Sequence, residues 1–202
     1  MVRTKLRVLY VPGLGDTNLG GQRLAVWIWH LWGVQAEIVP MHWESSESTD
    51  SKLTRLLERI DALAAQKMPV GLVGVSAGAS MVITAYSLRK SQLAGCVLLA
   101  GKVNRAAAIG ARYRAQNPAL VDSVQACERA LATLNASDRM HIQSRYGLID
   151  PVVARADSSV PGAQNHRLWA IGHTGTIVVQ LVFGAPLFLR FLKKAARRQN
   201  MK

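Results

Sequence analysis

The chain has 202 residues, of which 50% are apolar and 18% are charged, so it can bury a core as a single domain without disulfide staples. Its two cysteines, Cys96 and Cys127, are too few for a disulfide framework, and they lack metal-ligand spacing. The formal net charge of +13 attracts anions non-specifically, but no helix-turn-helix, RNA-binding sheet or zinc-finger signature accompanies it, which argues against a nucleic-acid-binding protein.

Apolar runs alternate with helical patterns through the first 100 residues. The short apolar runs predict four strands, over residues 6–11, 36–41, 70–75 and 96–100. Apolar residues at helical spacing predict a helix over 24–32 that Gly33 closes, one over 53–64 that ends before Pro69, and one over about 77–90. This alternation is typical of a parallel sheet, in which each strand is joined to the next by a helix.

Residues 104–136 break the rhythm with a basic stretch, followed by a helix for which Asn117 is the predicted N-cap and Pro118 the first turn. Two more strands are predicted over 141–146 and 166–171, and a long terminal helix begins near Thr174. The apolar run over 177–192 is shorter than the roughly 20 residues that cross a membrane. A packed helix, kinked near Gly184-Ala185-Pro186, is therefore expected there.

These elements predict an α/β fold with a mostly parallel sheet of about six strands and helices on both faces. The continuous apolar character of residues 70–75 and 96–100 indicates central strands that are buried on both sides. A single domain over residues 1–202 is expected, with a basic C-terminal helix or tail.

The sequence Gly74-Val75-Ser76-Ala77-Gly78 follows the third predicted strand and precedes a predicted helix. It matches G-x-S-x-G, a pattern that places serine on a sharp, strained turn between a strand and a helix. Glycine is expected at both ends of the motif because larger side chains would collide across the turn. The turn raises the hydroxyl above the carboxyl edge of the sheet, which predicts Ser76 as a nucleophile. The alternative is a glycine-rich turn that only packs tightly.

Two later loops complete a recognisable pattern. Asp150 follows the fifth strand within Gly-Leu-Ile-Asp-Pro-Val-Val, and His173 follows the sixth within Ala-Ile-Gly-His-Thr-Gly. With the serine turn, these loops make residues 6–195 resemble the α/β-hydrolase superfamily. That resemblance implies a catalytic triad of Ser76, Asp150 and His173 on a minimal hydrolase fold. The two leading antiparallel strands and a large lid domain of bigger family members have no counterpart in this sequence.

Other side chains compete for the acid and base roles. Asp157 lies in the same loop as Asp150 but farther from the strand end, and Asp138 precedes the strand. Four further histidines occupy positions where a surface or core role is the default; they are His30, His42, His141 and His166.

The resemblance also implies an oxyanion hole, built from the backbone N–H groups of Ala77 and Leu14. Leu14 lies in the loop Pro12-Gly13-Leu14-Gly15-Asp16, where proline replaces the histidine of the family's His-Gly-x loop. An ordinary strand-ending turn is the alternative for this loop.

A possible substrate pocket is expected from Gly13, His42 and Trp43. The two aromatic residues follow the carboxyl end of a strand, where ligands bind in such sheets. Trp43 is equally expected as packed core.

The favoured function is hydrolysis of a carboxylic ester or thioester through an acyl-enzyme on Ser76, with no cofactor and no metal. A non-catalytic binding protein with the same fold is one alternative. A lysophospholipase at a membrane surface is another, because the last 13 residues carry a cluster of cations: Arg190, Lys193, Lys194, Arg197, Arg198 and Lys202. A cytoplasmic location is expected, because the first apolar run stops at Pro12-Gly13 and is too short for a secretory signal.

Overall fold

The computed structural model describes residues 5–199 and contains one six-stranded sheet in the order β2-β1-β3-β4-β5-β6. The strands are β1 (Leu6–Val11), β2 (Val34–Ile38), β3 (Val70–Val75), β4 (Leu93–Leu99), β5 (Ile142–Ile149) and β6 (Gln164–Ile171). All five neighbouring pairs run parallel, so the predicted α/β architecture is confirmed.

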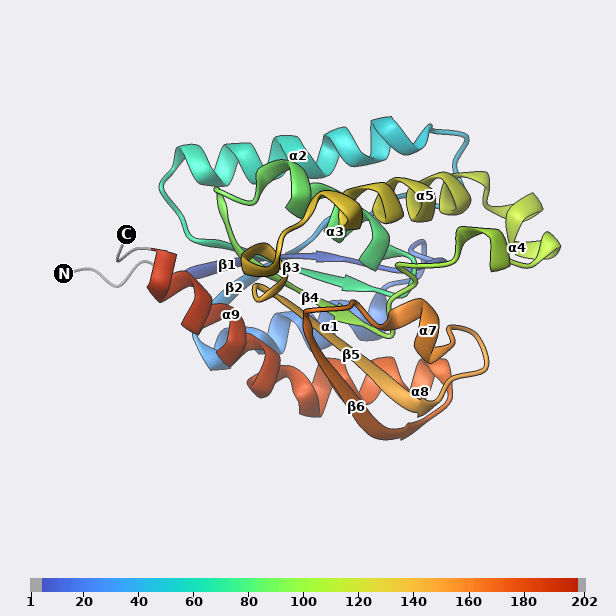
Figure 1. The fold of residues 1–202 in the computed structure, drawn as a ribbon. Helices are drawn as coiled ribbons and strands as arrows, with labels where there is room; N and C mark the ends of the chain where they lie inside the picture. Colours follow the sequence, from blue (N-terminus) through green and yellow to red (C-terminus); the bar gives the residue numbers. More distant parts are fainter. Residues whose placement is uncertain (1–4, 200–202) are drawn as a thin grey trace.

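Helices cover both faces of the sheet (Figure 1). One face carries α2 (Thr49–Ala65), α3 (Gly78–Arg89) and α5 (Pro118–Thr133), and the other carries α1 (Gly20–Ile28), α8 (His173–Val179) and α9 (Ala185–Gln199). The shorter elements are η1 (Trp29–Trp32), η2 (Ala106–Ala108), α4 (Ala111–Gln116), α6 (Ala136–Arg139), α7 (Arg155–Ser158) and the π-helical turn η3 (Gln180–Gly184). Two apolar cores result, one on each side of the sheet.

Local chemistry sets several boundaries. The 3₁₀ turn η1 ends at Gly33, whose φ of 67° is a left-handed conformation that glycine adopts without steric cost. Helix α2 begins after Ser48, whose hydroxyl accepts a hydrogen bond from the Ser51 N–H at 3.1 Å. Strand β2 spans Val34–Ile38 and corrects the predicted span of 36–41: it begins two residues earlier, and the chain leaves the sheet after Val39, whose N–H still donates to Tyr10 O at 2.8 Å. The N–H of Met41 instead donates to the Asp16 carboxylate at 2.7 Å.

The continuous helical run His173–Gln199 is long and apolar enough to cross a membrane, by length and composition alone. Within residues 5–199, 44% of its most apolar window is buried, and Phe188 and Leu192 are fully buried in the core beneath the sheet. At the position of the predicted kink, the π-helical turn η3 precedes Pro186, which has no N–H to donate. The final cation of the predicted basic tail, Lys202, lies outside the described residues.

Because every strand runs in the same direction, the carboxyl ends of all six strands meet at one edge of the sheet. The loops that follow β1, β3, β5 and β6 gather there, near α4, α7 and α8 (Figure 1). This is the edge at which parallel α/β sheets bind their ligands.

Candidate active site

Ser76 forms the turn between β3 and α3, at the centre of the sheet. Its φ of 50° is left-handed, a conformation that costs a non-glycine residue on the order of 1–3 kcal/mol. The backbone of β4 and its following loop holds the turn in place: the Ser76 N–H donates to Leu99 O at 3.0 Å, and the Lys102 N–H donates to Ser76 O at 3.0 Å. The serine therefore sits on a strained turn that the neighbouring strand supports.

Two glycines allow this turn, for different reasons. A Cβ on Gly74 would lie 2.7 Å from the Ala79 Cα, across the turn as the sequence predicts. A Cβ on Gly78 would instead lie 2.3 Å from the carbonyl oxygen of Val11 and 2.5 Å from that of Pro12. The second glycine is thus required by the end of β1, which passes directly beneath the start of α3.

His173 connects Ser76 to Asp150. Its Nε2 lies 2.9 Å from the Ser76 Oγ, and its Nδ1 lies 2.7 Å from the Asp150 Oδ2. A carboxylate only accepts hydrogen bonds, so in neutral His173 the Nδ1 carries the proton and Nε2 accepts from the serine hydroxyl. The other Asp150 oxygen accepts the N–H groups of Val152 and Val153, both at 2.9 Å.

The competing acids have other partners. Asp157 forms an ion pair with Lys102 at 3.0 Å, and both side chains are at least 90% buried. Asp138 closes a capping box with Asn135 at the start of α6 and pairs with Lys90 at 2.7 Å. Neither acid has a hydrogen bond to His173.

The four other histidines also bond elsewhere. His30 and His141 lie within hydrogen-bond distance of the backbone carbonyls of Trp27 and Ala94, and His166 contacts the Gln143 amide at 3.3 Å. His42 uses its backbone groups and leaves its ring exposed.

The loop after β1 lies against the nucleophile. A Cβ on Gly13 would be only 2.8 Å from the Ser76 Cβ, so the loop backbone approaches the serine as closely as a residue without a side chain allows. Leu14 and Ala77, the residues expected to form the oxyanion hole, border a cavity of about 200 Å³ together with Ser76. Ala77 also stands at the N-cap of α3, where backbone N–H groups lack partners within the helix.

A second, larger cavity of about 570 Å³ also borders Ser76 and lies between α1 and the α8–η3 segment. Both cavities reach Ser76, and Leu14, Tyr113 and Val152 border both of them. Tyr113 belongs to α4, a six-residue helix that the sequence does not predict, because this segment has no apolar periodicity. Two cavities therefore meet at Ser76, and the short helix α4 contributes a side chain to both.

No protein-family model and no curated protein sequence matches the chain. Solved structures match it in shape. One of two metagenome-derived lipolytic enzymes gives a TM-score of 0.71 at 12% identity, covering 95% of this chain and 94% of that chain. An α/β hydrolase from the metagenome of lagoon sediments at Mar Chica, Morocco, gives 0.63 at 14% identity, with 94% and 91% covered. The monoacylglycerol lipase of Paleococcus ferrophilus gives 0.57 at 12% identity, with 95% and 94% covered.

This chain has the α/β-hydrolase fold.

Within this hydrolase fold, two of the three expected pocket residues lie elsewhere. Gly13 borders the larger cavity, but His42 and Trp43 border neither cavity at Ser76. Trp43 is 1% exposed and packs in the core above the sheet, because its indole N–H finds a partner in the Pro12 carbonyl at 3.1 Å. Trp43 thus supports the loop after β1, and it does not form the floor of a pocket.

No second nucleophile competes with Ser76 among the cysteines. Cys96 and Cys127 are free thiols in the core, and burial raises the pKa of both, so neither forms a thiolate at neutral pH. Within residues 5–199, His, Cys, Asp and Glu side chains form no group of three or more that could hold a metal ion.

Proposed function

We propose that this chain is a serine hydrolase that cleaves carboxylic esters or thioesters through an acyl-enzyme on Ser76. The observation that carries the proposal is the position of the His173 ring, which lies within hydrogen-bond distance of the Ser76 hydroxyl on one side and of the Asp150 carboxylate on the other. A base between a nucleophile and an orienting acid is the arrangement that serine hydrolases use.

The geometry supports a two-step reaction. His173 Nε2 takes the hydroxyl proton as Ser76 Oγ bonds to the substrate's carbonyl carbon, and the carbonyl π electrons move to oxygen. Asp150 stabilises the imidazolium that forms. The tetrahedral intermediate collapses as His173 protonates the leaving alcohol or thiol, which leaves an acyl-serine. A water molecule, deprotonated by the same histidine, then releases the acid and restores the serine.

The two cavities support an ester as substrate. The larger cavity is bordered by Ser76 and by apolar side chains such as Ile177 and Leu181, and none of the residues 5–199 that border it is Asp, Glu, Lys or Arg. It would accept an uncharged acyl or alcohol group on one side of the scissile bond, while the 200 Å³ cavity would take a smaller group on the other side. An oxyanion between them would face the backbone donors expected from Leu14 and Ala77.

The test is covalent labelling combined with turnover. A fluorophosphonate should modify one residue, Ser76, of the wild-type protein and abolish its activity on a panel of p-nitrophenyl esters and acyl thioesters of graded chain length. Ser76→Ala should lose both labelling and turnover. A well-folded wild-type protein that neither labels nor turns over would favour the non-catalytic binding protein, and labelling that survives Ser76→Ala would place the nucleophile elsewhere.

A further inference from the structure

The loop beside Ser76, residues 12–16, is attached at both of its ends to one short segment, residues 41–43. At its start, the Pro12 carbonyl accepts the indole N–H of Trp43 at 3.1 Å. At its end, the Asp16 carboxylate, in a residue that is 5% exposed, accepts three successive backbone N–H groups. These come from Met41 and His42 at 2.7 Å each and from Trp43 at 3.3 Å.

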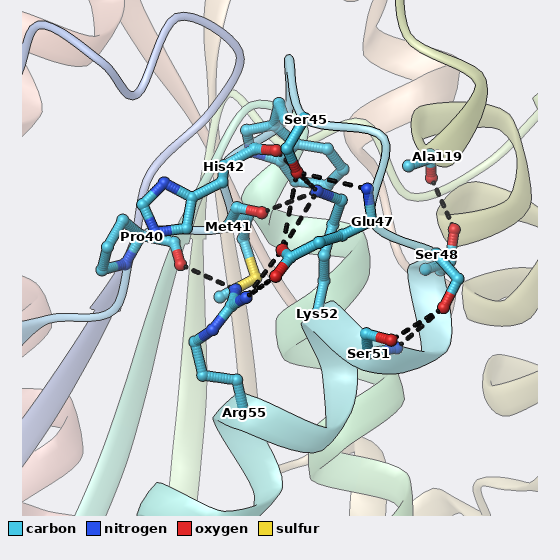
Figure 2. Close-up of polar contacts among 12 residues, drawn as sticks. Pro40, Met41, His42, Ser45, Glu47, Ser48, Ser51, Lys52, Arg55 and Ala119 are labelled. Carbon is cyan, nitrogen blue, oxygen red and sulfur yellow. Dashed lines mark hydrogen bonds and ion pairs between the residues drawn. The ribbon is translucent and has the colours of Figure 1, made fainter.

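A buried lysine holds the same segment from the opposite side. Lys52, the fourth residue of α2, is 0% exposed and extends to the segment that follows β2 (Figure 2). Its Nζ donates to the carbonyls of Met41 at 3.0 Å and His42 at 2.5 Å, and to the Ser45 hydroxyl at 2.8 Å. Glu47 lies 3.7 Å from the ammonium group.

The segment 41–43 therefore lies between two opposite charges, Asp16 and Lys52, and these two side chains together are called the clamp. Its N–H groups face the Asp16 carboxylate, and two of its carbonyls face the Lys52 ammonium group. Burial of a charge is costly unless its donors and acceptors find partners, and here backbone groups and the Ser45 hydroxyl supply them. Desolvation lowers the pKa of Lys52, while the carboxylates of Glu47 and Asp16 act in the opposite direction. The clamp also holds His42 at a left-handed φ of 51°.

A shift of the segment 41–43 would change the position of the backbone next to Ser76. The Pro12 carbonyl lies between the Trp43 indole and Gly78, where a Cβ would come within 2.5 Å of it. The next residue, Gly13, already approaches Ser76 to the limit that a backbone allows. A shift of the 41–43 segment would therefore move the loop relative to Ser76, and misplacement of about 1 Å at a catalytic site can cost about 100-fold in rate.

We propose that Asp16, Trp43 and Lys52 are positioning residues that fix loop 12–16, and with it the Leu14 backbone donor, against Ser76. This inference rests on the proposed hydrolase function. It assigns a role to a buried lysine and a buried aspartate that take no part in the proton transfers.

The sharpest test is Trp43→Phe, which keeps a ring in the core and removes the donor to Pro12. Its matched control is Tyr86→Phe, because the Tyr86 hydroxyl donates to the Asp138 carbonyl at 2.9 Å in a part of the molecule that borders neither cavity at Ser76. With active sites counted by fluorophosphonate titration, kcat per site should fall about tenfold in Trp43→Phe with little change in KM. Tyr86→Phe should keep the wild-type kcat.

An alkyl trifluoromethyl ketone separates positioning from a merely structural role. It adds to the serine hydroxyl and forms a tetrahedral oxyanion, so its Ki should rise in Trp43→Phe by the same factor as kcat/KM falls. Asp16→Asn should show both effects more strongly, at about 100-fold. If Lys52→Met folds, its kcat per site and its ketone Ki should change as they do in Trp43→Phe. If Lys52→Met does not fold, Trp43→Phe alone decides the question.

The outcomes keep the two proposals apart. If the wild type is active and Trp43→Phe matches Tyr86→Phe in kcat per site and in ketone Ki, the positioning role is wrong and the hydrolase proposal stands. A drop in melting temperature with unchanged kinetics per active site leads to the same conclusion. If the folded wild type neither labels nor turns over, both proposals fail.

Discussion

The centre and the edge of the sheet contribute to the candidate site in contrasting ways. Every residue of β3 and β4 is buried, and Ser76 follows β3 directly. Strand β6 lies at the edge, where only Ala170 is buried, yet it leads into His173. The nucleophile is thus placed by a packed core, whereas the base is placed beside a largely exposed strand.

The difference indicates that hydrogen bonds, and not core packing, fix the position of the His173 ring at the edge of the sheet. Asp150 links the two sides: its carboxyl is 3% exposed, it binds the His173 ring at 2.7 Å, and it is itself fixed by two backbone N–H groups. At the centre, the close approach of Gly78 and Gly13 to their neighbours leaves the serine little room to move. Removal of one bond at the edge should therefore damage catalysis without damage to the fold.

Asp150→Asn tests that expectation and should have the largest effect. An amide in place of the carboxylate favours the wrong imidazole tautomer, so kcat should fall by about 10⁴ while the unfolding free energy changes little. Steady-state kinetics on the best ester, together with urea unfolding followed by circular dichroism, would measure both. A variant that keeps more than a tenth of wild-type activity would show that the edge is positioned by something other than this bond.

The contrast in packing should be visible in stability. Leu98 on β4 is 0% exposed, and Leu98→Ala should cost about 2–5 kcal/mol of unfolding free energy through the cavity it leaves. Trp169 on β6 is 94% exposed, and Trp169→Ala should change that free energy by less than about 0.5 kcal/mol. Denaturant titrations of both variants would compare the two strands, and similar losses would contradict the distinction between centre and edge.

A smaller expected effect is the dependence of the unfolding free energy on pH through His166, a residue of the edge strand β6. Desolvation, with the nearby charge of Arg145, lowers the pKa of His166 below its ordinary value of 6.5. The unfolded chain then binds a proton more readily than the folded one, so this residue makes the protein less stable as pH falls below about 6.5. Above that pH the contribution disappears.

His166→Gln should therefore flatten the loss of unfolding free energy between pH 7.5 and pH 5. The measurement is a set of urea titrations across that range for the variant and the wild type. Parallel curves for the two proteins would contradict a depressed pKa at this position.

The same contrast explains what the sequence can reveal. Strand β3 agrees with its predicted bounds to the residue, because a fully buried strand is a continuous apolar run between breakers. Asp150 and His173 could be predicted because each lies in a loop after a predicted strand and within a sequence that resembles the family's acid or base loop, although neither β5 nor β6 is a continuous apolar run. The prediction for β2 begins two residues too late and extends three residues too far, because Val39 and Met41 are apolar but the chain leaves the sheet before Met41, whose N–H donates to Asp16. That contact is non-local and leaves no mark in the local pattern.

Other features have no sequence signal for a related reason. Helix α4 contains no buried residue, so it lacks the apolar spacing by which helices are predicted. The sequence leaves Trp43 equally consistent with a pocket wall and with the core, and its burial and its indole bond to Pro12 decide for the core. The buried Lys52 is charged, and charged residues on helices normally face solvent, so the spacing of α2 alone predicts nothing about its role.

Helix α4 has a consequence for protein engineering. It contributes Tyr113 to both cavities and no residue to the core, so it touches the proposed substrate space while its own folding contribution is small. Residues 111–116 are thus a natural place for grafted or randomised segments. A library at this position would alter which esters fit beside Ser76, and the sheet beneath would fold as before.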